Sequence, residues 1–248
     1  MTRHPTNAVA VFLVAGHAAL LAWSAWTHSP TGNETDYLPA GISHWLYGRF
    51  ALAAVNPPLV RMLAALPVLL VGPKTDWRHF SDRVADRAWF PVGGDFLRAN
   101  GPRSFWLYTL ARWACIPLSL CGAYVAWRWA RELYGPGAGL VTLTLWCLCP
   151  NMLAHGQMIT PDMGATALCL WANYRFWHWL KRPDWVSTLL CGVALGLAEL
   201  TKMTLIVLYV LWPVVWLYWA WRCRRGSAPT PLVLLRRIRP VAANNVLQ

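Results

Sequence analysis

Long runs of apolar residues, separated by short polar stretches, dominate the pattern of this chain. Six runs read as membrane-spanning helices, and they cover residues 8–26, 105–130, 137–154, 163–180, 186–198 and 203–221. A transmembrane helix needs about 20 mostly apolar residues. We therefore predict an all-α, polytopic membrane protein with six transmembrane helices, in which residues 1–221 form one membrane-embedded module.

The stretch between the first two runs, residues 29–104, carries mixed charge and one further apolar segment at 57–71. That segment is short for a span, contains Pro67 and carries Arg61. If it crossed the membrane, the arginine-rich C-terminal segment would face outward, against the positive-inside rule. We predict instead one large extracytoplasmic loop, with a helix at 57–71 lying on the membrane surface.

Composition and charge support a membrane location. Hydrophobic residues make up 57% of the chain and charged residues only 13%, which leaves too little polar surface for a soluble domain. The net charge of +12 comes from basic residues at one set of helix ends and in the segment 222–248. This pattern indicates cytoplasmic flanks beside membrane lipids rather than a nucleic-acid surface. We expect a multi-pass protein of the plasma (inner) membrane with both termini in the cytoplasm and a basic cytoplasmic tail at 222–248.

Small residues within the apolar runs have packing roles in this interpretation. The seven cysteines lie in or beside these runs, which favours packing over a disulfide framework or a metal site. Gly192 and Gly196 have the spacing that lets two membrane helices approach closely.

Polar residues at the outward-facing junctions are the candidates for chemistry. Glu34 and Asp36 follow the first span, where a carboxylate can act as a general base; the alternative is a solvated loop acid. Asp162 follows Thr160 and Pro161, a sequence that also suits an ordinary helix start.

Lys202 lies within nearly continuous apolar sequence. An ionisable residue at such a depth is costly and is a functional candidate by default. Its ammonium group could bind a lipid phosphate and stabilise it as a leaving group. The alternatives are an ion pair with Glu199, three residues earlier, or an extended side chain that reaches the headgroups.

Several short motifs share their order, spacing and predicted side of the membrane with one known family. They are Asn33 and Glu34, Pro39 to Gly41, Gly48 to Phe50, Asn56 to Leu59, Leu66 and Pro67, Pro150 to His155, Thr160 to Asp162, and Gly192 to Lys202. Together they resemble the dolichyl-phosphate-mannose protein mannosyltransferases (glycosyltransferase family 39) and their bacterial relatives, including the aminoarabinose transferase of lipid A. The resemblance implies the N-terminal half of a GT-C-class enzyme that uses a polyprenyl-phosphate-linked sugar.

The resemblance also implies roles for individual residues. Glu34 would be the catalytic base or its partner, with Asp36 as the alternative, and Asp162 would complete the catalytic set by organising the pocket. The carrier phosphate would be bound by Lys202, His155, Asn56 and Arg61. The acceptor would be a hydroxyl on a protein or a glycolipid, and no metal or cofactor is expected.

Two departures from the family pattern leave other functions open. Asn33 stands where family members carry the first acid of a pair, and the chain stops at Gln248, where further spans are expected. We expect a C-terminal half or a second subunit to complete the bundle. The alternatives to an enzyme are a truncated, non-catalytic relative or partner subunit and, less favoured, a transporter, which would place its charged groups near the midplane.

Overall fold

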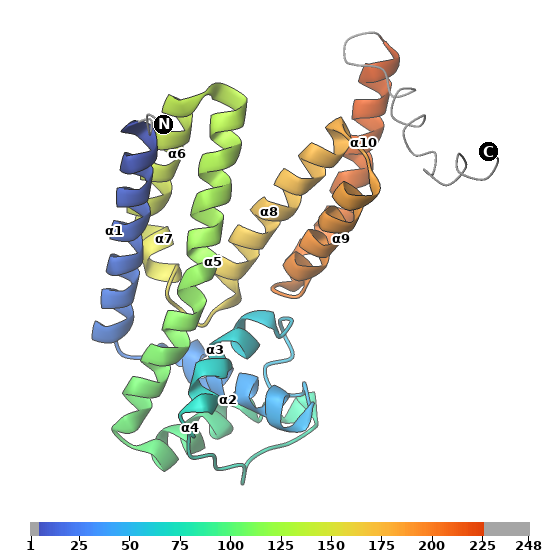
Figure 1. Ribbon diagram of the computed structural model, residues 1–248. Helices are drawn as coiled ribbons and strands as arrows, with labels where there is room; N and C mark the ends of the chain where they lie inside the picture. Colours follow the sequence, from blue (N-terminus) through green and yellow to red (C-terminus); the bar gives the residue numbers. More distant parts are fainter. Residues whose placement is uncertain (1–4, 226–248) are drawn as a thin grey trace, which may run out of the picture.

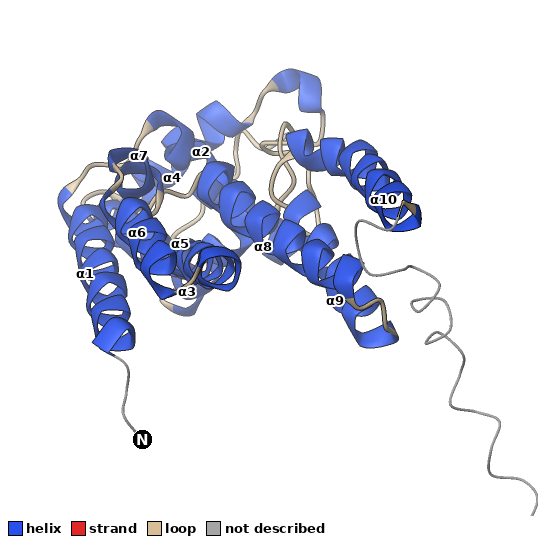
Figure 2. Cartoon of the chain, turned by 90° about the horizontal axis from the view of Figure 1, so that it is seen from above, coloured by secondary structure: helices blue, strands red, loops and turns tan. Residues whose placement is uncertain are grey.

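The computed structural model describes residues 5–225, and every regular element in that range is a helix (Figure 2). The predicted tail at 222–248 therefore lies almost wholly outside the described residues. The long or apolar helices are α1 (Pro5–Thr27), α5 (Arg103–Tyr134), α6 (Pro136–Leu148), α8 (Pro161–Lys181), α9 (Trp185–Glu199) and α10 (Leu208–Arg224). The shorter elements are α2 (Gly32–Tyr47), α3 (Leu59–Leu70), α4 (Trp89–Asn100), α7 (Pro150–His155) and the 3₁₀ turns η1 (Val84–Asp86) and η2 (Met203–Val207).

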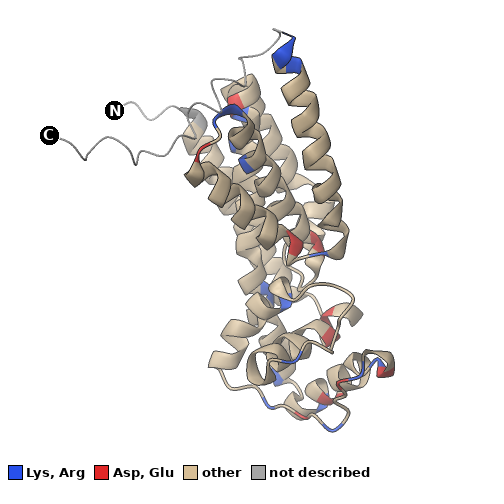
Figure 3. Ribbon diagram, turned by 90° about the vertical axis from the view of Figure 1, so that its right-hand side faces the viewer, with Lys and Arg blue, Asp and Glu red and all other residues tan. Residues whose placement is uncertain are grey.

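Helices α2, α3 and α4 form a separate unit at one end of the long helices (Figure 1). The start of α1, the α5–α6 turn and the α8–α9 turn lie at the other end. Charged residues gather at the two ends of the long helices and in the α2–α4 unit (Figure 3). The middles of the long helices carry few charges, and the position of the α2–α4 unit on one side of a membrane remains a prediction.

Within the described residues, three helical stretches are long and apolar enough to cross a membrane: Asn7–Thr27, Arg103–Tyr134 and Met203–Arg224. Helices α6 and α9 have 13 and 15 residues. At about 1.5 Å per residue each spans roughly 20 Å, less than the bilayer core of about 30 Å. The membrane character of the chain thus rests on three helices, and the count of six spans remains a prediction.

The predicted span at 137–154 is wrong in detail, because the helix breaks at Cys149. This residue has the extended backbone angles φ −64° and ψ 124°, and a new short helix, α7, begins at Pro150. A proline disfavours the helical conformation of the residue before it. The break lets the chain turn towards the α2–α4 unit before α8 begins.

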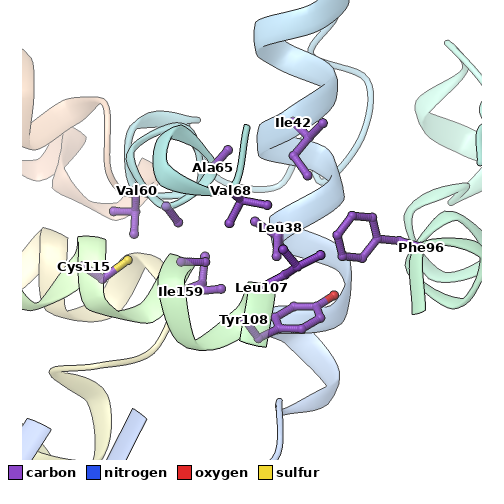
Figure 4. Close-up of a cluster of buried hydrophobic side chains, with 12 residues drawn as sticks. Leu38, Ile42, Val60, Ala65, Val68, Phe96, Leu107, Tyr108, Cys115 and Ile159 are labelled. Carbon is purple, nitrogen blue, oxygen red and sulfur yellow. The ribbon is translucent and has the colours of Figure 1, made fainter. Parts of the chain in front are cut away.

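The prediction of a helix at 57–71 is confirmed as α3, which starts two residues later, after both prolines. The same loop also forms α2 and α4, which the sequence analysis did not predict. Side chains from α2, α3, α4 and α5 share one apolar core that includes Leu38, Val60, Phe96 and Tyr108 (Figure 4). The loop is therefore a packed helical unit at the N-terminal end of α5.

Glycine decides how closely α2 and α3 approach. A Cβ atom on Gly41 would lie 2.1 Å from the backbone oxygen of Arg61, so only glycine fits this contact. Gly192 and Gly196 behave differently, since a Cβ on either would meet nothing within 4 Å. The prediction that they mediate close packing is wrong within the described residues, because α9 turns its other face, with Ala194 and Ala198, towards α8.

Candidate functional site

A buried ion pair between Glu34 and Arg112 connects the α2–α4 unit to the long helices. Arg112 Nη2 lies 2.6 Å from Glu34 Oε2, and Nε lies 2.8 Å from Oε1. Both side chains are at most 2% exposed. Such a bidentate pair has the geometry of a strong charge-assisted contact.

The remaining donors of Arg112 bind the end of α1. Nη1 donates to the carbonyl oxygens of Ala25 and His28, and Nη2 donates to that of Ser29. The last carbonyls of a helix have no partner within the helix and need one from outside. Arg112 therefore fixes the end of α1 and, through Glu34, the first turn of α2.

Glu34 also binds two further segments. Its Oε2 accepts hydrogen bonds from the backbone N–H and hydroxyl of Thr31, and its Oε1 accepts one from the backbone N–H of Ile159 at 3.2 Å. Burial by itself would raise the pKa of Glu34, but the hydrogen bonds and charge of Arg112, with the two N–H donors, lower it below its usual value. This geometry favours a positioning role over proton transfer, because the carboxylate is enclosed and fully bonded.

Asp36 has a different environment on the same helix. It is 6% exposed, its Oδ1 accepts a hydrogen bond from the Thr35 hydroxyl at 3.4 Å, and no salt bridge holds it in residues 5–225. Burial raises the pKa of Asp36 to about 6. Of the two candidate bases, Glu34 and Asp36, Asp36 is therefore the one that could exchange a proton near neutral pH.

Asp162 and Lys202, which are 40 residues apart, meet where α8 begins and α9 has ended. Lys202 Nζ lies 2.7 Å from Asp162 Oδ1, and their side chains are 33% and 43% exposed. The alternative pairing of Lys202 with Glu199 is not formed. An ion pair this open contributes only about 0–1 kcal/mol, so Lys202 remains able to bind another anion.

The start of α3 lies against the same junction. The backbone N–H of Leu59 donates to the carbonyl of Leu200 at 3.0 Å, two residues before Lys202. A Cβ on Gly164, in the first turn of α8, would lie 2.6 Å from Val60 Cγ2. The first turns of α3 and α8 and the end of α9 therefore form one site.

Arg61 supplies a second cation to this region. It is 4% exposed, its Nε donates to His44 Nε2 at 2.8 Å, and its Nη2 donates to the backbone oxygen of Asn56. His44 Nδ1 donates in turn to the carbonyl of Arg49, which fixes the neutral tautomer. Burial lowers the pKa of His44 to about 4 and that of Arg61 to about 10, so at neutral pH only the arginine is charged.

No carboxylate forms a salt bridge with Arg61 in the described part of the chain. Arg61 and Asn56 border a narrow gap together with Tyr37 and Pro161. Pro161 immediately precedes Asp162, so this gap leads towards the ion pair with Lys202. A buried cation without an anionic partner is costly. The gap has a volume of only about 10 Å³, room for about one water molecule, so Arg61 is a candidate for contacting an anion at the edge of the gap and not for enclosing one.

The structure brings some of the predicted site residues together and separates others. Asp162, Lys202, Asn56 and Arg61 border one junction, and Glu34 reaches it only through its hydrogen bond to Ile159. His155 is exposed at the end of α7, and Asn33 is exposed in the first turn of α2. Asp162 starts α8 after Thr160 and Pro161, as the sequence predicted, although the Thr160 side chain forms no capping hydrogen bond.

Sequence reasoning missed the roles of Arg112, Tyr37 and His44. An arginine inside an apolar run was a detectable signal for Arg112, but its partner, 78 residues away, was not. Tyr37 and His44 lie in α2, whose apolar face could have been recognised from Leu38, Ile42 and their neighbours.

Comparison with known protein families finds a match. A family model described as dolichyl-phosphate-mannose-protein mannosyltransferase matches residues 108–237, which is more than half of the chain. No curated protein and no solved structure matches it. The matched range includes Arg112, Asp162 and Lys202, and it leaves out α2, α3 and α4.

Proposed function

Since the chain belongs to the dolichyl-phosphate-mannose-protein mannosyltransferase family, whose members are membrane glycosyltransferases, we propose that it moves a sugar from a polyprenyl-phosphate carrier to a hydroxyl acceptor. The transfer would take place on the extracytoplasmic face of the plasma (inner) membrane. The observation that carries this proposal is the open ion pair of Lys202 and Asp162, which lies where α3, α8 and the end of α9 meet.

In the proposed reaction, the acceptor oxygen forms a bond to the anomeric carbon while the bond from that carbon to the phosphate oxygen breaks. The leaving phosphate gains negative charge, which Lys202 would stabilise as a point charge and Arg61 as a second cation. Asp162 would hold Lys202 in place by accepting a hydrogen bond from one of the three N–H donors of the Lys202 ammonium group. The other two donors would then be available to the phosphate.

The acceptor proton needs a carboxylate. In a direct displacement the base stands on the face of the sugar opposite the leaving group, whereas Asp162 lies 2.7 Å from the cation assigned to that leaving group. Glu34 is enclosed by Arg112. We therefore assign the base to Asp36, whose side chain lies against Gly93 of α4 and whose pKa is raised to about 6, and we assign Glu34 to positioning.

A second candidate function is a non-catalytic relative that binds the carrier and acts with another subunit. Three features of α2 favour it: Asn33 stands where the family pattern has an acid, Glu34 is bonded to Arg112, and Asp36 is only 6% exposed. Both candidates share the site for the carrier phosphate and differ in turnover.

The test is to measure binding and turnover separately, on the full chain in lipid nanodiscs. Lys202→Met keeps the apolar bulk, and we expect it to weaken binding of undecaprenyl phosphate about 10- to 100-fold, the loss of one charge-assisted hydrogen bond. Lys181→Met is the matched control, because Lys181 lies at the other end of α8 over the Trp177 ring. Equal binding by Lys202→Met and the native chain would refute the phosphate site.

Turnover then separates the two functions. With a polyprenyl-phosphate sugar as donor, Asp36→Asn should abolish transfer while leaving carrier binding at the native level. A native chain that binds the carrier and transfers no sugar to any hydroxyl acceptor would favour the non-catalytic relative. Transfer that continues in Asp36→Asn would remove Asp36 from the mechanism.

A further inference from the structure

A separate cavity of about 660 Å³ lies beside the end of α1 and the α7 segment. Its walls include Leu20, Trp23 and Ser24 from α1, Arg112 from α5, and Gln157 and Met158 after α7. It shares no lining residue with the gap at Asn56 and Arg61. Its size falls within the range of about 300–1,000 Å³ typical of small-ligand pockets.

Gln157 carries the polar character of this cavity. The residue is 4% exposed, and its Nε2 donates to the Ser24 hydroxyl at 2.8 Å. Its Oε1 is buried and has no hydrogen-bond partner among residues 5–225. A buried acceptor without a donor is unfavourable, so a ligand that brings a hydroxyl group would satisfy it.

The charge of the cavity excludes an anion as the preferred ligand. Arg112 is the charged residue in its wall, and its guanidinium is bonded to Glu34 and to the carbonyls of Ala25, His28 and Ser29. It therefore offers neither net charge nor a free donor to the cavity. The carrier phosphate accordingly belongs at Lys202, and this cavity fits a neutral molecule.

The other walls combine apolar and hydroxyl-binding groups. Trp23, Leu20 and Met158 present apolar surface, and His28 and Ser29 add polar groups near the end of α1. A sugar ring has the matching composition, with hydroxyl donors at its edge and C–H groups on its faces. Trp23 and Trp26 are also exposed on the outer surface of α1, where a lipid carrying the sugar would lie.

We propose that this cavity binds the neutral sugar ring of a glycolipid, and that this ring is part of the acceptor. The proposal rests on the proposed function, because an acceptor is meaningful only for a transferase. It resolves the choice between protein and glycolipid acceptors in favour of the glycolipid. The hydrogen bond from a ring hydroxyl to Gln157 Oε1 would select the sugar.

The test measures binding of hexyl β-D-glucoside to the full chain in nanodiscs by saturation-transfer NMR. Triethylene glycol monohexyl ether, which has the same chain and a single hydroxyl, is the comparison probe. Gln157→Met should weaken glucoside binding about tenfold and leave binding of the ether unchanged. Asn151→Met, which removes an exposed amide on α7 outside the cavity, should bind the glucoside as the native chain does.

A second variant guards against misfolding of Gln157→Met. Ala154→Phe fills the cavity from an exposed position of its wall and should weaken glucoside binding at least as much as Gln157→Met does. The proposal is overturned if either variant binds the glucoside normally, or if the ether binds as tightly as the glucoside, the result expected for a simple lipid pocket. Lys202→Met should retain glucoside binding. Normal carrier binding by Lys202→Met, with glucoside binding still weakened in Gln157→Met, would refute the proposed phosphate site and leave the sugar site standing.

Discussion

Replacing Glu34 with glutamine distinguishes a catalytic acid from a structural one. If Glu34 were the general base, the nearly isosteric Glu34→Gln would fold normally and lose only turnover. The structure leads to another expectation, because the side chains of Glu34 and Arg112 are 0% and 2% exposed and form a bidentate pair. The variant would leave a buried guanidinium without a counter-charge, facing an amide that brings N–H donors of its own.

The expected loss of stability is large. Removing one partner of a buried ion pair costs roughly 3–5 kcal/mol, against a total stability of about 5–15 kcal/mol for a folded protein. For a chain of this size the loss corresponds to a fall in melting temperature on the order of 10 °C. Arg112→Met should cost a similar amount. The double variant should cost less than the sum of the two, because it leaves no unpaired charge.

Thermal unfolding in detergent micelles can be followed through the native cysteines. Cys115, Cys147 and Cys191 are buried and free, so a thiol-reactive fluorophore reports their exposure as the chain unfolds. Asp36→Asn is the matched control at pH 7.5, on the same helix. Burial disfavours the charged form of Asp36 and raises its pKa to about 6, so removing that charge should not lower stability.

The reasoning fails if Glu34→Gln melts within about 2 °C of the native chain, since roughly 3 kcal/mol would shift it further. It also fails if Asp36→Asn is the less stable of the two variants. A native-like melting temperature combined with lost turnover in Glu34→Gln would restore Glu34 as the base.

Three further predictions follow from the packing, the buried histidine and the topology. Gly41→Ala should cost more than 2 kcal/mol, as overpacking against an immovable backbone oxygen does, while Gly192→Ala, with nothing within 4 Å, should melt at or above the native temperature. The pKa of His44 is about 4 in the folded state and 6.5 when unfolded, so the unfolded chain takes up a proton as pH falls below 6.5. The stabilisation present above pH 6.5 is therefore lost towards pH 4. The melting temperature of the native chain minus that of His44→Gln should be larger at pH 7 than at pH 5. In intact cells, Thr75→Cys should react with a membrane-impermeant thiol reagent and Arg182→Cys should not, relative to native labelling; the reverse pattern would invert the membrane orientation.

The sequence by itself determined the elements that depend on local pattern. Apolar runs and interrupting prolines predicted the positions of the long helices and of α3, because helix formation in a membrane follows from which residues can leave water. The costly position of Lys202 marked it as a candidate without any knowledge of its neighbours. The same reasoning could not exclude Gly192 and Gly196 from a helix contact, since spacing gives the face of a helix and not what covers it.

Only the tertiary structure decided which charges meet. Glu34 and Asp36 are two residues apart and equally acidic in sequence, yet Glu34 is paired with Arg112 and Asp36 forms no salt bridge with the described residues 5–225. The difference arises because residues two positions apart lie on roughly opposite faces of α2, with Glu34 directed to α5 and Asp36 to Gly93 of α4. Lys202 likewise could reach Glu199 or Asp162, and the approach of α9 to the start of α8 selected Asp162. Charge interactions depend on distance and burial, and both are properties of the folded chain.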